Sequence, residues 1–86
     1  MGLLEFINEL SKKRDLPVLN IVFSPHQDYA TIYLRFKFRE DRDKALEIAE
    51  MARRHGLVVS VYIEKVDVTG KRRNMIIVRE VSSERG

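Results

Sequence analysis

The residues best suited to chemistry lie on one face of an alternating stretch, Tyr29–Arg39. Successive side chains of a β-strand point to opposite sides, so one face is predicted to be core and carries Ile32, Leu34, Phe36 and Phe38. The opposite face combines aromatic rings and bases without an acid: Tyr29, Thr31, Tyr33, Arg35, Lys37 and Arg39. Arginine and lysine neutralise phosphates, and tyrosine rings stack on bases or pack along sugars. The pattern predicts a nucleic-acid face. The alternative is a solvated face whose long side chains pair across strands with acids such as Glu64.

Two further groups of bases are candidates for phosphate contact. Lys71, Arg72 and Arg73 follow Gly70 at the expected tip of a hairpin, where bases could reach a phosphate backbone or simply be solvated. The run Lys12–Arg14 is expected in the last turn of a first helix, where cations complement the carbonyl end of the helix dipole. The predicted binding residues are Tyr33, Arg35, Lys37, Arg39, Lys71, Arg72 and Arg73.

The chain carries no motif that predicts catalysis, a metal or a cofactor. His26 and Asp28 lie in an expected turn, but metal sites need three or four ligands. His55 fits the charge pattern at the end of a helix. There is no cysteine, and the four glycines are isolated, so neither a phosphate-binding loop nor a nucleophile elbow is present. We therefore expect a non-enzymatic protein without cofactor or metal.

These residues must be positioned by alternating helices and strands. Apolar residues at helical spacing predict a helix over Gly2–Lys13, and a second runs from Asp41 as N-cap to Gly56 as the left-handed residue after its end. Period-two patterns and turns predict strands over Val18–Ser24, Tyr29–Arg39, Leu57–Val66 and Lys71–Val81. The predicted fold is a two-layer αββαββ domain of the α+β class over residues 1–81. It has a four-stranded, mainly antiparallel sheet with both helices on one face, and 82–86 form a frayed tail.

The facing of the other strands follows from the same alternation. Leu19, Ile21 and Phe23 are expected to share one face of the first strand and Val18, Asn20 and Val22 the other. In the third strand Leu57, Val59, Val61 and Ile63 are expected to face the helix, while Val58, Ser60, Tyr62 and Glu64 face out. Burying Ile76 and Val78 in the fourth strand leaves Arg73, Met75, Ile77 and Arg79 outward and avoids burying arginines. Aliphatic residues on this outward face suggest that a second subunit covers part of it.

The composition narrows the class of protein. With 86 residues and no cysteine, the chain can bury only ~60% of its unfolded surface and has no disulfides, so a homodimer is expected. A net charge of +3 and a pI near 9.4 favour polyanionic partners. The charged content of 34% resembles that of thermophile proteins. With no signal-like start and no apolar run of ~18 residues, a cytoplasmic protein without membrane contact is expected.

The order of elements, and the way YLRFKFREDRDKALEIAEMARRHG leads into a basic hairpin, resembles one half of a LAGLIDADG-type homing endonuclease. The first helix departs from that family, because Leu10–Asp15 has neither the small packing residues nor the acid–Gly end of its motif. The resemblance implies DNA binding by the sheet face, without cleavage, as a dimer. Our leading hypothesis is a small nucleic-acid-binding protein, with DNA favoured over RNA. The rival is a protein–protein interaction module or structural subunit that homo-oligomerises through the open sheet face or an edge strand.

Overall fold

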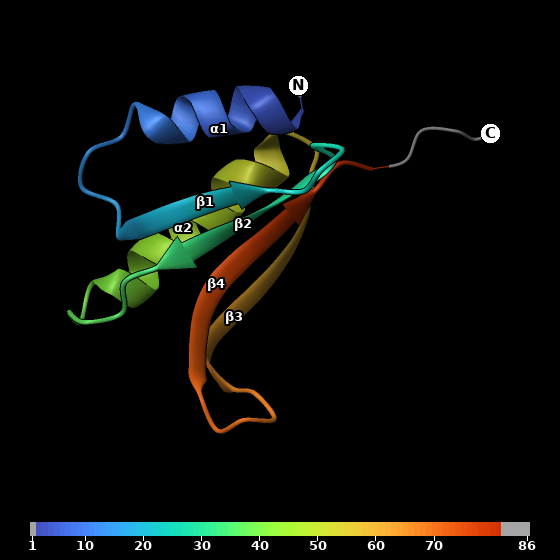
Figure 1. The fold of residues 1–86 in the computed structure, drawn as a ribbon. Coiled ribbons are helices and arrows are strands. Elements are labelled where there is room, and N and C mark those ends of the chain that lie inside the picture. The colour runs from blue at the N-terminus through green and yellow to red at the C-terminus, as the bar shows by residue number, and fades with distance from the viewer. Residues whose placement is uncertain (1, 82–86) are drawn as a thin grey trace.

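The computed structural model describes residues 2–81 and has the predicted α+β order (Figure 1). The elements are α1 (Leu3–Ser11), β1 (Val18–Phe23), β2 (Tyr29–Leu34), α2 (Asp41–Arg54), β3 (Val58–Val66) and β4 (Arg72–Arg79). The tail predicted at 82–86 lies outside the described residues.

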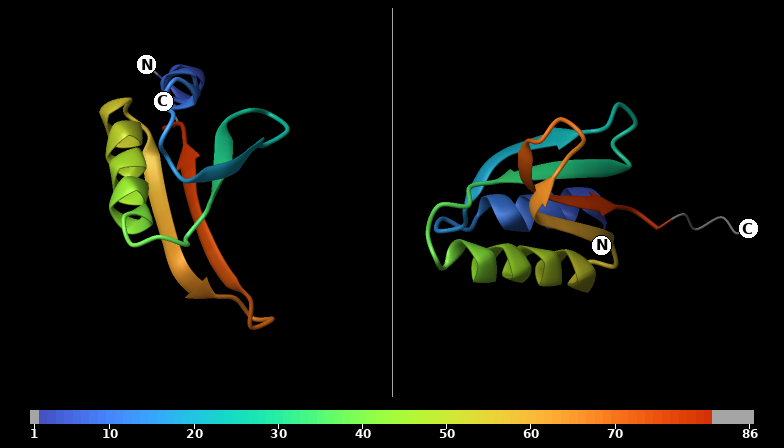
Figure 2. Two further views of the ribbon diagram at one scale, coloured as in Figure 1. Left: turned by 90° about the vertical axis from the view of Figure 1, so that its left-hand side faces the viewer. Right: turned by 90° about the horizontal axis from the view of Figure 1, so that it is seen from below.

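The strands form one sheet in the order β1-β2-β4-β3, and every neighbouring pair is antiparallel. Both helices cover the same face (Figure 2), and Leu3 and Phe6 of α1, Ile48 of α2, Ile32 of β2 and Ile76 of β4 belong to one buried cluster. Within residues 2–81 no helix covers the opposite face of the sheet, which we call the open face (Figure 2). At the end remote from α1, the β3–β4 hairpin projects beyond both helices (Figure 1).

Helix α1 is shorter than predicted. The amides of Lys12 and Lys13 donate to the carbonyls three residues earlier, so the helix tightens and ends at Ser11. The run Lys12–Arg14 therefore follows the helix instead of forming its last turn, and the prediction for these bases was wrong. At its other end the backbone N–H of Leu3 donates to Glu80 Oε2 at 2.9 Å, which ties the start of α1 to the end of β4.

Helix α2 ends as predicted. Gly56 has φ +80°, and the amides of Gly56 and Leu57 donate to Arg53 and Ala52, which is the Schellman pattern. The predicted N-cap was wrong, because Asp41 is the first residue of the helix and Glu40 precedes it as N-cap. Asp41 is also fully buried, since its carboxylate turns back toward the loop before the helix.

Strand β1 does not alternate as predicted, because it contains a β-bulge. Val18 pairs with Leu34 and Asn20 with Tyr33, so Leu19 has no partner of its own in β2. Leu19 is 67% exposed instead of sharing a face with Ile21, and Val18 packs against the core instead of facing outward.

Strand β2 ends at Leu34, five residues earlier than the predicted Arg39. The amides of Lys37 and Phe38 donate to Asp41 Oδ2, both at 2.8 Å, and this turns the chain toward α2 instead of continuing the strand. Phe38, predicted to be core, is consequently 51% exposed. Ile32 and Leu34, which precede the turn, are buried as predicted.

The β3–β4 hairpin contains a second bulge. Ile76 and Val78 are fully buried, which confirms the predicted facing of β4. In β3, Tyr62 pairs with Met75 but Lys65 pairs with Arg73, and Glu64 between them has φ +56°. The extra residue shifts the alternation and brings Lys65 to the side on which Tyr62 lies.

Candidate functional site

The open face consists of cross-strand rows that the register defines. One row joins Asn20, Tyr33, Met75 and Tyr62; the next joins Val22, Thr31, Ile77 and Ser60; a third joins Tyr29, Arg79 and Val58; and the bulge adds Lys65 beside Arg73. The middle row of the described face is uncharged and includes Val22, which is 46% exposed, while Val58 beside Arg79 is 40% exposed.

The ends of the open face are basic. Arg79 lies at one end, and Lys65 and Arg73 lie at the other, where the hairpin projects. Within residues 2–81, no acidic residue belongs to any of these cross-strand rows. The open face therefore combines two tyrosines and a methionine in one row with cations at both ends.

Arg35, predicted to bind phosphate, forms an ion pair with Asp41. Its Nε donates to Asp41 Oδ2 at 3.3 Å and its Nη2 to Asp41 Oδ1 at 2.9 Å, and its guanidinium lies 5.0 Å from the ring centre of Phe38. The bond from Arg35, with the amide bonds from Phe38 and Lys37, holds the pKa of Asp41 well below its usual range. Arg35 therefore has a structural role at the start of α2.

The other predicted bases are separated by the fold. Lys37 and Arg39 are exposed in the loop between β2 and α2, off the strands. Lys71 lies in the hairpin turn. Arg72 faces the side opposite Arg73, with its Nη1 4.0 Å from Glu64 Oε1. Of the predicted binding residues, the structure brings only Tyr33 and Arg73 to the open face.

Sequence reasoning missed Tyr62, Lys65, Met75 and Arg79 as candidate binding residues. Alternation placed Tyr62, Met75 and Arg79 outward, but no single strand showed bases interleaved with aromatic residues at these positions. The open face is assembled from residues of several strands, and a pattern within one strand does not reveal it. Lys65 had no local signal at all, since only the bulge at Glu64 brings it to this face.

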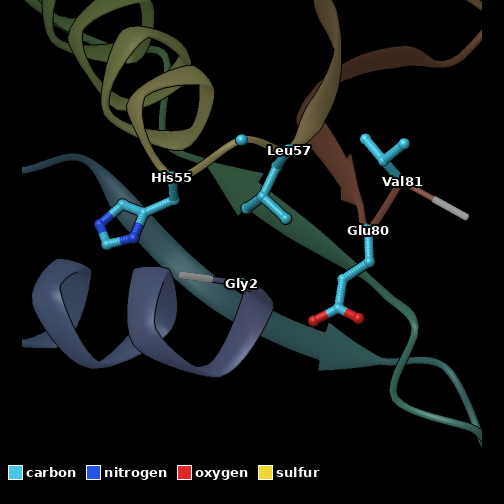
Figure 3. Close-up of a pocket in the computed structure, with 6 residues that line it drawn as sticks. Gly2, His55, Leu57, Glu80 and Val81 are labelled. Atoms are coloured by element: carbon cyan, nitrogen blue, oxygen red, sulfur yellow. The ribbon is translucent and has the colours of Figure 1, made fainter. Parts of the chain in front are cut away.

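A hollow of about 280 Å³ lies beside the start of α1 and the end of β4, and it is a weaker candidate for a binding site (Figure 3). It is lined by Gly2, His55, Gly56, Leu57, Glu80 and Val81. His55 Nε2 lies 2.6 Å from Glu9 Oε1, and this bond lowers the pKa of Glu9. Glu80 is occupied by the amide of Leu3. Both side chains thus fasten α1 to its neighbours.

The predicted turn residues His26 and Asp28 do not form a ligand set. Asp28 Oδ1 accepts from Ser24 Oγ at 2.8 Å, and this bond lowers the pKa of Asp28. Within residues 2–81 no three His, Cys, Asp or Glu side chains lie close enough together to hold a metal. In the same range no helix is long and apolar enough to cross a membrane.

The chain shows no significant match to any family model, curated protein or solved structure in comparisons with known proteins. The resemblance to half of a LAGLIDADG-type endonuclease therefore stays a prediction, and the function must be argued from the open face.

Proposed function

We propose that this protein binds nucleic acid on the open face of its sheet. The observation that carries the proposal is the row Tyr33–Met75–Tyr62, with Arg79 at one end of the face and Lys65 and Arg73 at the other. Tyrosine rings and a flexible thioether offer flat apolar contact to bases, while the flanking cations attract phosphates. Adjacent strands lie ~4.8 Å apart, so the two tyrosines, two strands apart, are separated by ~10 Å across the face.

The charge distribution favours an anionic ligand over a second copy of the same face. Cations at both ends would meet like charges if two open faces were packed together, and like charges across an interface are unfavourable. A polyanion instead gains from every one of these residues and releases its condensed counterions when it binds.

The test is fluorescence anisotropy of labelled single-stranded and duplex oligonucleotides over a series of salt concentrations. Binding should weaken steeply with salt, and Arg79→Ala should reduce the slope of log K against log salt by ~0.7–0.9 if it contacts one phosphate. Arg53→Ala is the matched control, because it removes the same charge from an exposed site on α2, beside Glu50. The absence of binding at low salt, or an equal loss in both variants, would contradict the proposal.

A second candidate function is self-association through the same face. The observation that favours it is the uncharged row Val22–Thr31–Ile77–Ser60, in which the aliphatic side chains of Val22 and Ile77 lie on the open face. Light scattering at increasing protein concentration tests it. Self-association would be supported in place of nucleic-acid binding if wild type forms a dimer, the Ile77→Lys variant is a monomer, and added oligonucleotide does not change the dimer.

A further inference from the structure

A second hollow, of about 380 Å³, lies where the β3–β4 hairpin begins to project from the sheet. It is lined by Tyr62, Lys65, Val66, Asp67, Arg73 and Met75. Its volume falls within the ~300–1,000 Å³ range of small-molecule sites. Tyr62 and Met75 line this hollow and also belong to the row Tyr33–Met75–Tyr62, so the hollow continues the open face toward the hairpin tip.

Asp67 holds one wall of this hollow in place. Its Oδ1 accepts from the amide of Thr69 at 2.9 Å, from Thr69 Oγ1 at 2.6 Å and from the amide of Lys71 at 3.0 Å. Its Oδ2 accepts from Arg73 Nε at 2.8 Å. These bonds also keep the pKa of Asp67 well below its usual range, so the carboxylate remains ionised.

The contact with Asp67 orients Arg73 without occupying its outer nitrogens. A guanidinium has five N–H donors, and Asp67 takes only the one on Nε. Within residues 2–81 the two Nη groups make no hydrogen bond, and the side chain is 44% exposed. This leaves four N–H donors on the two Nη nitrogens at the rim of the hollow, a geometry that suits the oxygens of a phosphate.

We propose that this hollow holds one nucleotide of a single strand, with its base against Tyr62 and Met75 and its phosphate at Arg73 and Lys65. The proposal rests on the proposed function and names the form of its ligand. In a duplex the faces of the bases are stacked on each other and cannot lie on a side chain, whereas an unpaired base can be splayed onto an aromatic ring. The flat apolar side of the hollow and the anion-binding rim together therefore favour a single strand.

The hairpin contains its own control for this assignment. Arg72 and Arg73 are adjacent in sequence and equal in charge, but Arg72 points to the opposite face near Glu64 and does not line the hollow. Replacing either by alanine changes the net charge equally, so a larger loss of binding in Arg73→Ala than in Arg72→Ala cannot come from net charge alone.

The experiment follows the methyl groups of methionine by NMR in the full chain. Met75 lines the hollow, while Met51 is 1% exposed in the core and serves as the internal reference. The probes are oligothymidylate, its duplex with oligoadenylate, and inorganic tripolyphosphate. We expect the single strand to shift the Met75 signal and leave the Met51 signal in place.

Affinity measurements on variants complete the test. Arg73→Ala should weaken binding of oligothymidylate by about tenfold, because a hydrogen bond to a charged group is lost, and Arg72→Ala by less than about twofold. Tyr62→Leu should weaken binding by about tenfold, and Tyr62→Phe should retain most of it, because stacking needs the ring and not the hydroxyl.

The outcomes separate this subsite from the function on which it rests. If oligothymidylate binds in a salt-dependent way but Met75 does not respond, or the Arg72 and Arg73 variants weaken equally, the subsite is refuted and the open face still binds. If the duplex shifts Met75 as strongly as the single strand, the assignment to single strands is overturned. An equal shift with tripolyphosphate alone would refute the contact with a base. If none of the probes binds, both proposals fail.

Discussion

Removal of the Asp41 carboxylate should destabilise the protein more than removal of its partner Arg35. Asp41 is fully buried and accepts hydrogen bonds from the Arg35 side chain and from the amides of Lys37 and Phe38. In Asp41→Ala both amides lose their acceptor, and the guanidinium loses its partner. The unpaired guanidinium contributes less to the loss of stability than the two amides do, because the Arg35 side chain is 40% exposed and water can solvate it.

From these losses we expect Asp41→Ala to lower the melting temperature by roughly 10–15 °C, since each orphaned donor is costly in a domain of this size. Asp41→Asn should fall between wild type and Asp41→Ala, because an amide oxygen still accepts but carries no charge. Arg35→Ala should cost less than Asp41→Ala, since Asp41 keeps both amide donors, although its buried carboxylate loses its counter-ion.

Thermal unfolding followed by circular dichroism measures this order, and the oligonucleotide assay on the same variants separates structure from binding. A loss of affinity in Arg35→Ala as large as in Arg73→Ala, with the melting temperature unchanged, would refute the reasoning and restore Arg35 as a binding residue. The matched control is Arg53→Ala, whose bond to Glu50 is exposed and 3.5 Å long, so its melting temperature should stay near that of wild type.

Three further predictions test the rest of the fold. The bond to His55 lowers the pKa of Glu9 in the folded protein. This bond therefore stabilises the protein at pH values above the pKa that Glu9 has in the unfolded chain, and the stabilisation is lost as the pH falls through the pKa in the folded protein. Urea midpoints of wild type and Glu9→Gln should converge in acid. Gly56→Ala should cost about 1 kcal/mol in urea unfolding because φ is +80°, although no atom beyond the adjacent residues lies within 4 Å of the added methyl group, and a neutral result would contradict the strain. Leu19→Lys should leave the urea midpoint unchanged because the bulge exposes Leu19, whereas Ile21→Lys should lower it; an equal loss in both variants would mean that β1 alternates regularly, with Leu19 and Ile21 on the same face.

Much of the fold could be predicted because it depends on local patterns. The apolar spacing of Leu3, Phe6 and Leu10 and the alternation around Ile76 and Val78 are set by helix and strand geometry, which neighbouring residues reveal by themselves. Gly56 was found for the same reason, since few residues other than glycine adopt a left-handed conformation after a helix.

The site could be predicted only in part, because single-strand alternation does not show where a strand leaves the sheet. The pattern around Arg35 continues to Arg39, but the strand ends once Asp41 accepts the amides of Lys37 and Phe38, and no periodicity signals that bond. Arg35 has the chemistry of a phosphate ligand and instead balances a buried carboxylate.

The sequence by itself determined the order of helices and strands, the inner faces of β3 and β4, and an excess of bases. Only the tertiary structure decided which bases share a surface. It placed Arg73 on the open face and Arg72 on the other, and the bulge at Glu64 brought Lys65 next to Arg73. The physical reason is that cross-strand register is fixed by backbone pairing between distant segments, and one added residue reverses the facing of the side chains that follow it.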